Sequence, residues 1–102
     1  MAPTAISAAV PRLRSTLAGR VTEVQANSRP WLRFDVEITD GTGSITLRFI
    51  GRDAVPGMRP GRCVRVQGTP AEEQGRLIML NPLYEFTSEG SEIHECARVP
   101  MD

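Results

Sequence analysis

The chain contains no lysine: all twelve of its basic residues are arginines. An arginine guanidinium is a planar fork that pairs with phosphate and stacks on bases, whereas a lysine ammonium is a point charge. A GC-rich genome, which favours arginine over lysine everywhere, is the simpler explanation for this absence. We therefore attach functional meaning to particular arginines and none to the missing lysine.

The chain has no excess charge either, because twelve acidic residues balance the twelve arginines. Domains that bind nucleic acid strongly are usually basic, so this balance argues against tight, indiscriminate binding to phosphate backbones. The charges are nevertheless separated along the chain. Residues 12–76 hold eleven arginines and seven acids, whereas residues 77–102 hold one arginine and five acids. This pattern predicts a basic domain followed by an acidic tail.

Residues for a metal centre or a catalytic site are scarce. The two cysteines, Cys63 and Cys96, have no CxxC spacing, and the single histidine, His94, lies near the C-terminus. Zinc sites require paired ligands at short spacing. The sequence also has no nucleophile elbow and no phosphate-binding loop. We therefore expect no metal, no cofactor and no enzymatic activity.

No apolar run is long enough to span a membrane, and residues 1–15 lack the basic start and apolar core of a secretory signal. These absences predict a cytoplasmic protein with reduced thiols and no membrane partner.

One domain is expected from 102 residues, a length that buries a core without disulfides. Prolines interrupt residues 1–16, which we expect to form a loose N-terminal arm with a short helix over residues 12–16. We place the folded domain at residues 17–87 and an acidic C-terminal tail at residues 88–102.

Period-two alternation is the strongest structural signal in the sequence. Residues 31–39 (WLRFDVEIT) predict a strand that directs Leu32, Phe34, Val36 and Ile38 inward, and residues 44–50 (SITLRFI) predict a second. The intervening Asp40-Gly41-Thr42-Gly43 predicts a hairpin turn.

Three further strands complete the expected set. Gly19 lies inside a strand over residues 17–26 and predicts a bulge or bend there. Residues 51–61, rich in proline and glycine, predict a loop with at most one helical turn. The last two strands are expected at residues 62–69, with Val64 and Val66 buried and Cys63 exposed, and at residues 76–87, after a turn over residues 70–75 and with an interruption at Asn81-Pro82.

The order and spacing of these pieces resemble the OB-fold nucleic-acid-binding family. The resemblance is greatest to the anticodon-binding domains and the wedge domain of RecG-type helicases, here as a small stand-alone protein. It implies an all-β, five-stranded Greek-key barrel with a short or absent helix between the third and fourth strands. The matching segments are Gly19-Arg20-Val21, Asp40-Gly41-Thr42-Gly43, Ile45-Thr46-Leu47-Arg48-Phe49, Pro60-Gly61, Val64-Arg65-Val66-Gln67-Gly68 and Asn81-Pro82-Leu83-Tyr84-Glu85.

In this family the ligand crosses the outer face of the second and third strands. Single strands bind there by aromatic stacking and by a positive groove. Trp31, the only tryptophan, is the candidate stacking platform, although it could instead cover one end of the barrel. The candidate nucleic-acid-binding residues implied by the resemblance are Arg29, Trp31, Arg33, Thr46, Arg48 and Arg52.

The register of the hairpin decides how Arg48 is used. If Gly41-Thr42 are the turn centre, Arg48 lies opposite Asp35 and its charge is compensated. If Asp40-Gly41 are the centre, Arg48 lies opposite Arg33, and a basic pair attracts an anion. Asp-Gly is the better turn pair, so we favour the second register.

Two functions remain open from the sequence. The first is a non-enzymatic binder of single-stranded DNA or RNA with modest affinity. The alternative is a protein-interaction adaptor that docks on a larger enzyme, which the zero net charge and the acidic Glu72-Glu73 favour. A related hypothesis is that the acidic tail folds over the basic face and competes with nucleic acid. The sequence does not determine the oligomeric state.

Overall fold

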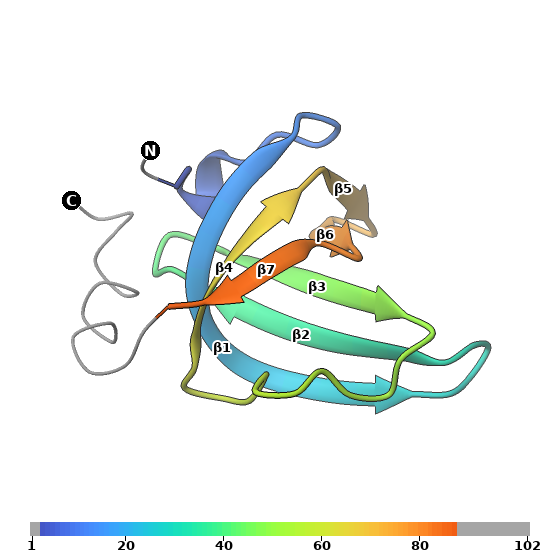
Figure 1. The fold of residues 1–102 in the computed structure, drawn as a ribbon. Coiled ribbons are helices and arrows are strands. Elements are labelled where there is room, and N and C mark those ends of the chain that lie inside the picture. The colour runs from blue at the N-terminus through green and yellow to red at the C-terminus, as the bar shows by residue number, and fades with distance from the viewer. Residues whose placement is uncertain (1–2, 88–102) are drawn as a thin grey trace.

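The computed structural model describes residues 3–87, which form an all-β domain with one short 3₁₀ helix (Figure 1). The expected tail at residues 88–102 lies outside the described residues. The elements are η1 (Ile6–Ala8), β1 (Ser15–Asn27), β2 (Arg33–Thr39), β3 (Ser44–Ile50), β4 (Cys63–Gly68), β5 (Pro70–Glu73), β6 (Arg76–Leu80) and β7 (Leu83–Phe86). In this described part, no helix is long and apolar enough to cross a membrane.

Seven strands form one strongly curved sheet in the order β5-β6-β3-β2-β1-β4-β7 (Figure 1). All neighbouring pairs are antiparallel except β3 with β6. The predicted count of five is therefore wrong. One extra strand, β5, lies where the sequence predicted a turn. The other, β7, arises because Asn81-Pro82 divides the strand expected over residues 76–87 into β6 and β7.

The expected turn over residues 70–75 is mostly strand. Pro70–Glu73 forms β5 and pairs with β6. The turn itself is limited to Gln74 and Gly75, whose φ angles are 53° and 80°. Two successive positive φ angles are typical of the tight hairpin turns that match strand twist.

The alternation predicted for β2 and β3 is confirmed in the core. Phe34, Val36 and Ile38 are buried from β2, and Val64 and Val66 are buried from β4. Leu32 is the exception: it is 40% exposed because β2 begins only at Arg33. The remaining large core side chains include Leu17, Val21, Ile45, Leu47, Phe49 and Met79.

β1 is long because it pairs with two different strands. Its first half pairs with β4 and its second half with β2, and the register shifts between Val21 and Glu23. The bulge therefore lies beyond Gly19. Gly19 instead allows the backbones to approach: a Cβ atom there would lie 2.8 Å from the carbonyl oxygen of Thr39.

The N-terminal segment is packed on the sheet and not loose. Ile6 is buried, and its N–H donates to Oδ2 of Asp40 at 2.8 Å. The helix expected over residues 12–16 is absent, because β1 begins at Ser15. The domain limit at residue 16 stays a prediction.

The connection between β3 and β4 contains turns and no helix, as the sequence predicted. It still contributes to the core through Val55 and Met58. Cys63, at the start of β4, is buried and disulfide-bonded. The expectations of an exposed side chain and a reduced thiol are therefore both wrong for Cys63.

Candidate nucleic-acid interface

The six candidate residues lie on or beside the outer face of β2 and β3. Arg33 belongs to β2, and Thr46 and Arg48 belong to β3. Arg29 and Trp31 lie in the loop between β1 and β2, and Arg52 follows β3. The structure thus places all six along two adjacent strands and the loops at their ends. It separates them into a central group and an end group, which differ in charge.

Asp35, and not Arg33, lies opposite Arg48 across the β2–β3 pair. The register that we favoured from the sequence is therefore wrong. The reason is Asp40, whose buried carboxylate accepts hydrogen bonds from the N–H and the hydroxyl of Thr42, at 2.8 and 2.6 Å. Such side-chain bonds to backbone two residues ahead are typical of aspartate turns. They hold the four residues from Asp40 to Gly43 as the loop.

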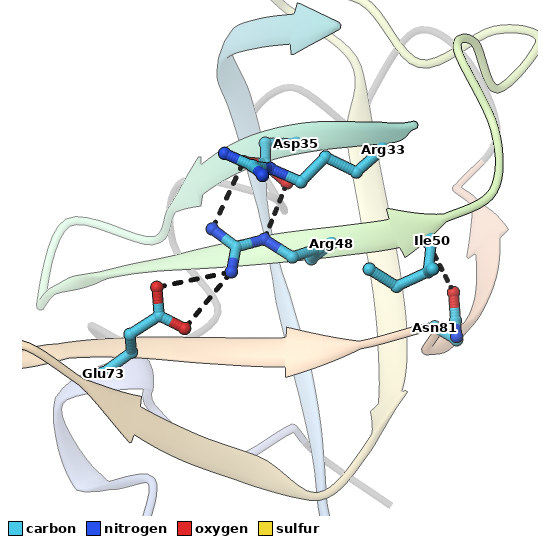
Figure 2. A network of polar contacts seen from close by, with 6 residues as sticks. All are labelled: Arg33, Asp35, Arg48, Ile50, Glu73 and Asn81. Carbon is cyan, nitrogen blue, oxygen red and sulfur yellow. Dashed lines mark hydrogen bonds and ion pairs between the residues drawn. The ribbon is translucent and has the colours of Figure 1, made fainter. Parts of the chain in front are cut away.

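Arg48 is the centre of a compensated charge network (Figure 2). Its Nε and Nη2 donate to the two carboxylate oxygens of Asp35, at 3.0 and 3.3 Å, while Nη1 donates to Glu73 at 3.2 Å. Arg33 contacts the same Asp35 carboxylate at 3.4 Å. The hydrogen bond with Asp35 raises the pKa of Arg48 above its ordinary value, against a smaller opposing effect of burial. Arg48 is therefore a permanent cation whose charge is compensated by Asp35 and Glu73.

A hollow of about 470 Å³ opens on this face between β1, β2, β3 and the β5–β6 hairpin. Four of its lining residues are acids, whereas Arg48 and Arg76 are its two cations. Two of the acids, Glu23 and Glu37, lie directly opposite each other across β1 and β2. The centre of the face is therefore not the positive groove that the sequence suggested.

One end of this face is apolar, in contrast to its charged centre. Trp31 is 53% exposed, and Leu32, Ile50 and Leu80 are also exposed, at 40%, 39% and 53%. Hydrogen bonds hold the segments that carry three of them side by side. Gly51 N–H donates to the Leu32 carbonyl oxygen, and Ile50 N–H donates to Oδ1 of Asn81, the residue after Leu80 (Figure 2). We call Trp31, Leu32, Ile50 and Leu80 the apolar end.

Two arginines flank the apolar end. Arg29 precedes Trp31 by two residues, and Arg52 follows Ile50 by two. Both are exposed, and neither makes a hydrogen bond or ion pair with any residue in the range 3–87. Exposed aromatic and aliphatic surface beside uncompensated guanidinium groups is suited to a ligand that combines flat apolar rings with negative charge.

Sequence reasoning missed Leu32, Ile50 and Leu80 as surface residues of the site. Leu32 was assigned to the core from its position in the alternation. Leu80 reaches this face because β6 pairs with β3 in parallel, which places Leu80 beside Arg48. No local pattern in the sequence indicates that pairing.

No group of three or more His, Cys, Asp or Glu side chains suited to a metal ion is present among residues 3–87. His94 and Cys96, considered from the sequence, lie outside the described residues.

Known structures share this fold. A chain in a structure of a replication protein A heterotrimer bound to single-stranded DNA superposes with a TM-score of 0.62 at 24% identity. The match covers 80% of the present chain and 63% of the other. A chain of the Stn1–Ten1 complex of S. pombe superposes with a TM-score of 0.65 at 15% identity, covering 86% and 68%. The fold is OB-like.

Comparison of the sequence with known proteins does not assign the chain to a family. No protein-family model matches the chain, and no curated protein matches it. The present chain spans about two thirds of each structural neighbour, and the likeness concerns the fold.

Proposed function

We propose that this protein binds single-stranded nucleic acid, without catalysis and with modest affinity, at the apolar end of the β2–β3 face. The observation that carries the proposal is the exposed Trp31, two residues after Arg29, together with Arg52 just after β3; neither arginine pairs with an acid among residues 3–87. A base stacked on an aromatic side chain contributes about 1–3 kcal/mol to binding. The neighbour from replication protein A, described as bound to single-stranded DNA, supports the same ligand class.

The six candidate residues take different parts in this proposal. Trp31 stacks a base, and Arg29 and Arg52 contact phosphates directly. Arg33 and Thr46 lie along the continuing path of the strand. Arg48 contributes only when a phosphate displaces Glu73 from it. The narrower resemblance to anticodon-binding and RecG-type wedge domains stays a prediction, as does the choice between DNA and RNA.

The test is fluorescence anisotropy with labelled single-stranded DNA and RNA at two salt concentrations. We expect micromolar, salt-sensitive binding that weakens roughly tenfold to a hundredfold in Trp31→Ala, because the stacking energy corresponds to one or two factors of ten. Leu13→Ala is the matched control, since Leu13 is 60% exposed and lies in the N-terminal segment. Equal affinities of the two variants would refute the assignment.

A second function has its own supporting observation. Four exposed large apolar side chains at one end of a small domain are typical of a protein-interaction surface, and both structural neighbours come from multi-subunit assemblies. We therefore keep an adaptor role as the alternative. Absence of nucleic-acid binding at low salt, followed by a Trp31-dependent pull-down of a protein, would favour it.

A further inference from the structure

Asn81 joins the end of β6 to the end of β3 at the apolar end (Figure 2). Its backbone N–H donates to the Arg48 carbonyl oxygen at 2.7 Å, and its side-chain Oδ1 accepts from Ile50 N–H at 2.9 Å. Asn81 is thus bonded covalently to Leu80 and by a hydrogen bond to Ile50, which are two of the four residues of the apolar end. The strand contacts proposed so far do not include it.

The bond from Ile50 fixes the orientation of the Asn81 amide. An N–H donor requires Oδ1 as its acceptor, because the other amide atom, Nδ2, carries two N–H groups and is itself a donor. Nδ2 makes no hydrogen bond with any residue in the range 3–87, and Asn81 is exposed. The backbone of Asn81 has a φ of 44°, a conformation that asparagine adopts more readily than most residues. The apolar end therefore carries an oriented, accessible pair of amide donors.

Amide donors beside apolar surface are suited to the edge of a nucleobase. Guanine and thymine (or uracil) carry a carbonyl oxygen at the ring position where adenine and cytosine carry an amino group. An amide N–H donates to the carbonyl oxygen, whereas it meets the amino group donor against donor. Unstacked bases of single strands present these edges for recognition. The orientation of Asn81 therefore favours bases that carry the carbonyl oxygen.

The apolar neighbours should make this contact discriminating. Leu80 and Ile50 are 53% and 39% exposed, so a base that covers them displaces water from the adjoining amide. An amide that loses water and gains no acceptor carries an unfavourable desolvation cost. A site built to bond one polar group therefore disfavours an analogue that lacks this group. The phosphates, in contrast, are left to Arg29 and Arg52.

We propose that Asn81 is a specificity-determining residue of the single-strand site, and that its Nδ2 donates to the exocyclic carbonyl oxygen of a uracil, thymine or guanine held at the apolar end. The inference rests on the proposed function and adds a base preference to it. The ligand is then a single strand with one of these bases at the stacked position.

The first experiment compares oligodeoxyuridine with oligodeoxycytidine of equal length by fluorescence anisotropy. These strands share a backbone and a ring size and differ at the exocyclic group that Asn81 would contact. Wild type should bind oligodeoxyuridine about threefold to tenfold more tightly, the value of one hydrogen bond. Asn81→Asp keeps an acceptor for Ile50 N–H and replaces the Nδ2 donors by an acceptor, so the preference should reverse toward cytosine.

Asn27→Asp is the matched control, because it adds the same charge in the same row of the sheet. Asn27 lies opposite Arg33, which lies opposite Ile50. It should weaken binding of both oligonucleotides alike and leave their ratio unchanged. An unchanged ratio in Asn81→Asp, or an equal shift of the ratio in Asn27→Asp, would overturn the inference while leaving the proposed function intact. Absence of binding to either oligonucleotide by wild type would refute the proposed function and this inference with it.

A measurement on wild type needs no variant to fold. In an NMR titration, oligodeoxyuridine should shift the Asn81 side-chain amide resonances saturably, with the Asn27 amide as the internal control. An abasic oligonucleotide of the same length keeps the phosphates and removes the bases, so it should leave the Asn81 amide nearly unshifted. Equal shifts of the Asn81 amide with both oligonucleotides would contradict a contact with a base.

Discussion

Arg48 lies directly opposite Asp35 across β2 and β3 and donates to both of its carboxylate oxygens. The remaining Nη1 of Arg48 reaches Glu73 at the tip of the β5–β6 hairpin. A residue that resembles a phosphate contact in the sequence is thus held by two acids. Glu73 is the more accessible of these, with 49% of its side chain exposed against 17% for Asp35.

Glu73→Gln should therefore strengthen single-strand binding. The substitution removes the charge that competes with phosphate for Arg48 while leaving the Asp35 bonds intact. We expect affinity to rise roughly twofold to fivefold at low salt, because one charge-assisted contact becomes available. Glu72→Gln removes the same charge from the preceding residue, which makes no ion pair within residues 3–87. Anisotropy would distinguish the two variants, and an equal gain in both would mean that only net charge matters.

The flanking arginines should set the salt dependence of binding. Each phosphate contact with a single strand contributes about 0.7 to the slope of log K against log salt. Replacing both Arg29 and Arg52 by glutamine should then lower that slope by about 1.4. Arg14→Gln is the control from the N-terminal segment. An unchanged slope in the double variant would place the phosphate contacts elsewhere.

Asp40→Ala should be among the most destabilising polar substitutions in the domain. The buried carboxylate joins the hairpin loop to the N-terminal segment through Thr42 and Ile6. Its removal leaves buried N–H groups without an acceptor, which we expect to lower the free energy of unfolding by about 2–4 kcal/mol. Urea denaturation would measure the loss. Asp53→Ala, at an exposed loop position, should change it by less than about 0.5 kcal/mol, and similar values for the two would contradict the role of Asp40.

Gly19→Ala should also destabilise the fold, by about 1–3 kcal/mol. The added methyl would meet the Thr39 carbonyl oxygen at 2.8 Å, a backbone atom that cannot move without disturbing the β1–β2 pair. At Gly43 the nearest atom would lie 3.4 Å away and φ is not positive, so Gly43→Ala is the matched control. Thermal unfolding of both variants would measure the difference. A larger loss of stability in Gly43→Ala than in Gly19→Ala would contradict this prediction.

The sequence correctly predicted elements whose structure depends on local residue patterns. The alternation over residues 44–50 defined β3 to the residue, and the proline- and glycine-rich connection was correctly expected to lack a helix. β5 was missed because its residues were predicted as a turn, and Asn81-Pro82 was predicted as an interruption within one strand, because a bent strand and two strands have the same alternation.

The charge pattern of the candidate site depends on contacts between residues far apart in the chain, which local sequence patterns do not indicate. The register of β2 with β3 follows from Asp40, whose acceptor role includes a backbone N–H 34 residues away. The partner that compensates Arg48 from the hairpin is 25 residues away. Turn propensity alone therefore favoured the wrong register and a basic patch that the structure does not contain.

Trp31 is the only tryptophan, so its emission reports directly on the apolar end. The most direct test of the account is a fluorescence titration with unlabelled single-stranded DNA, run beside the anisotropy measurement. We predict saturable quenching with the same midpoint as the anisotropy change, and loss of both at high salt. Binding by anisotropy with unchanged Trp31 emission would contradict the account, because it would place the strand on another face of the domain.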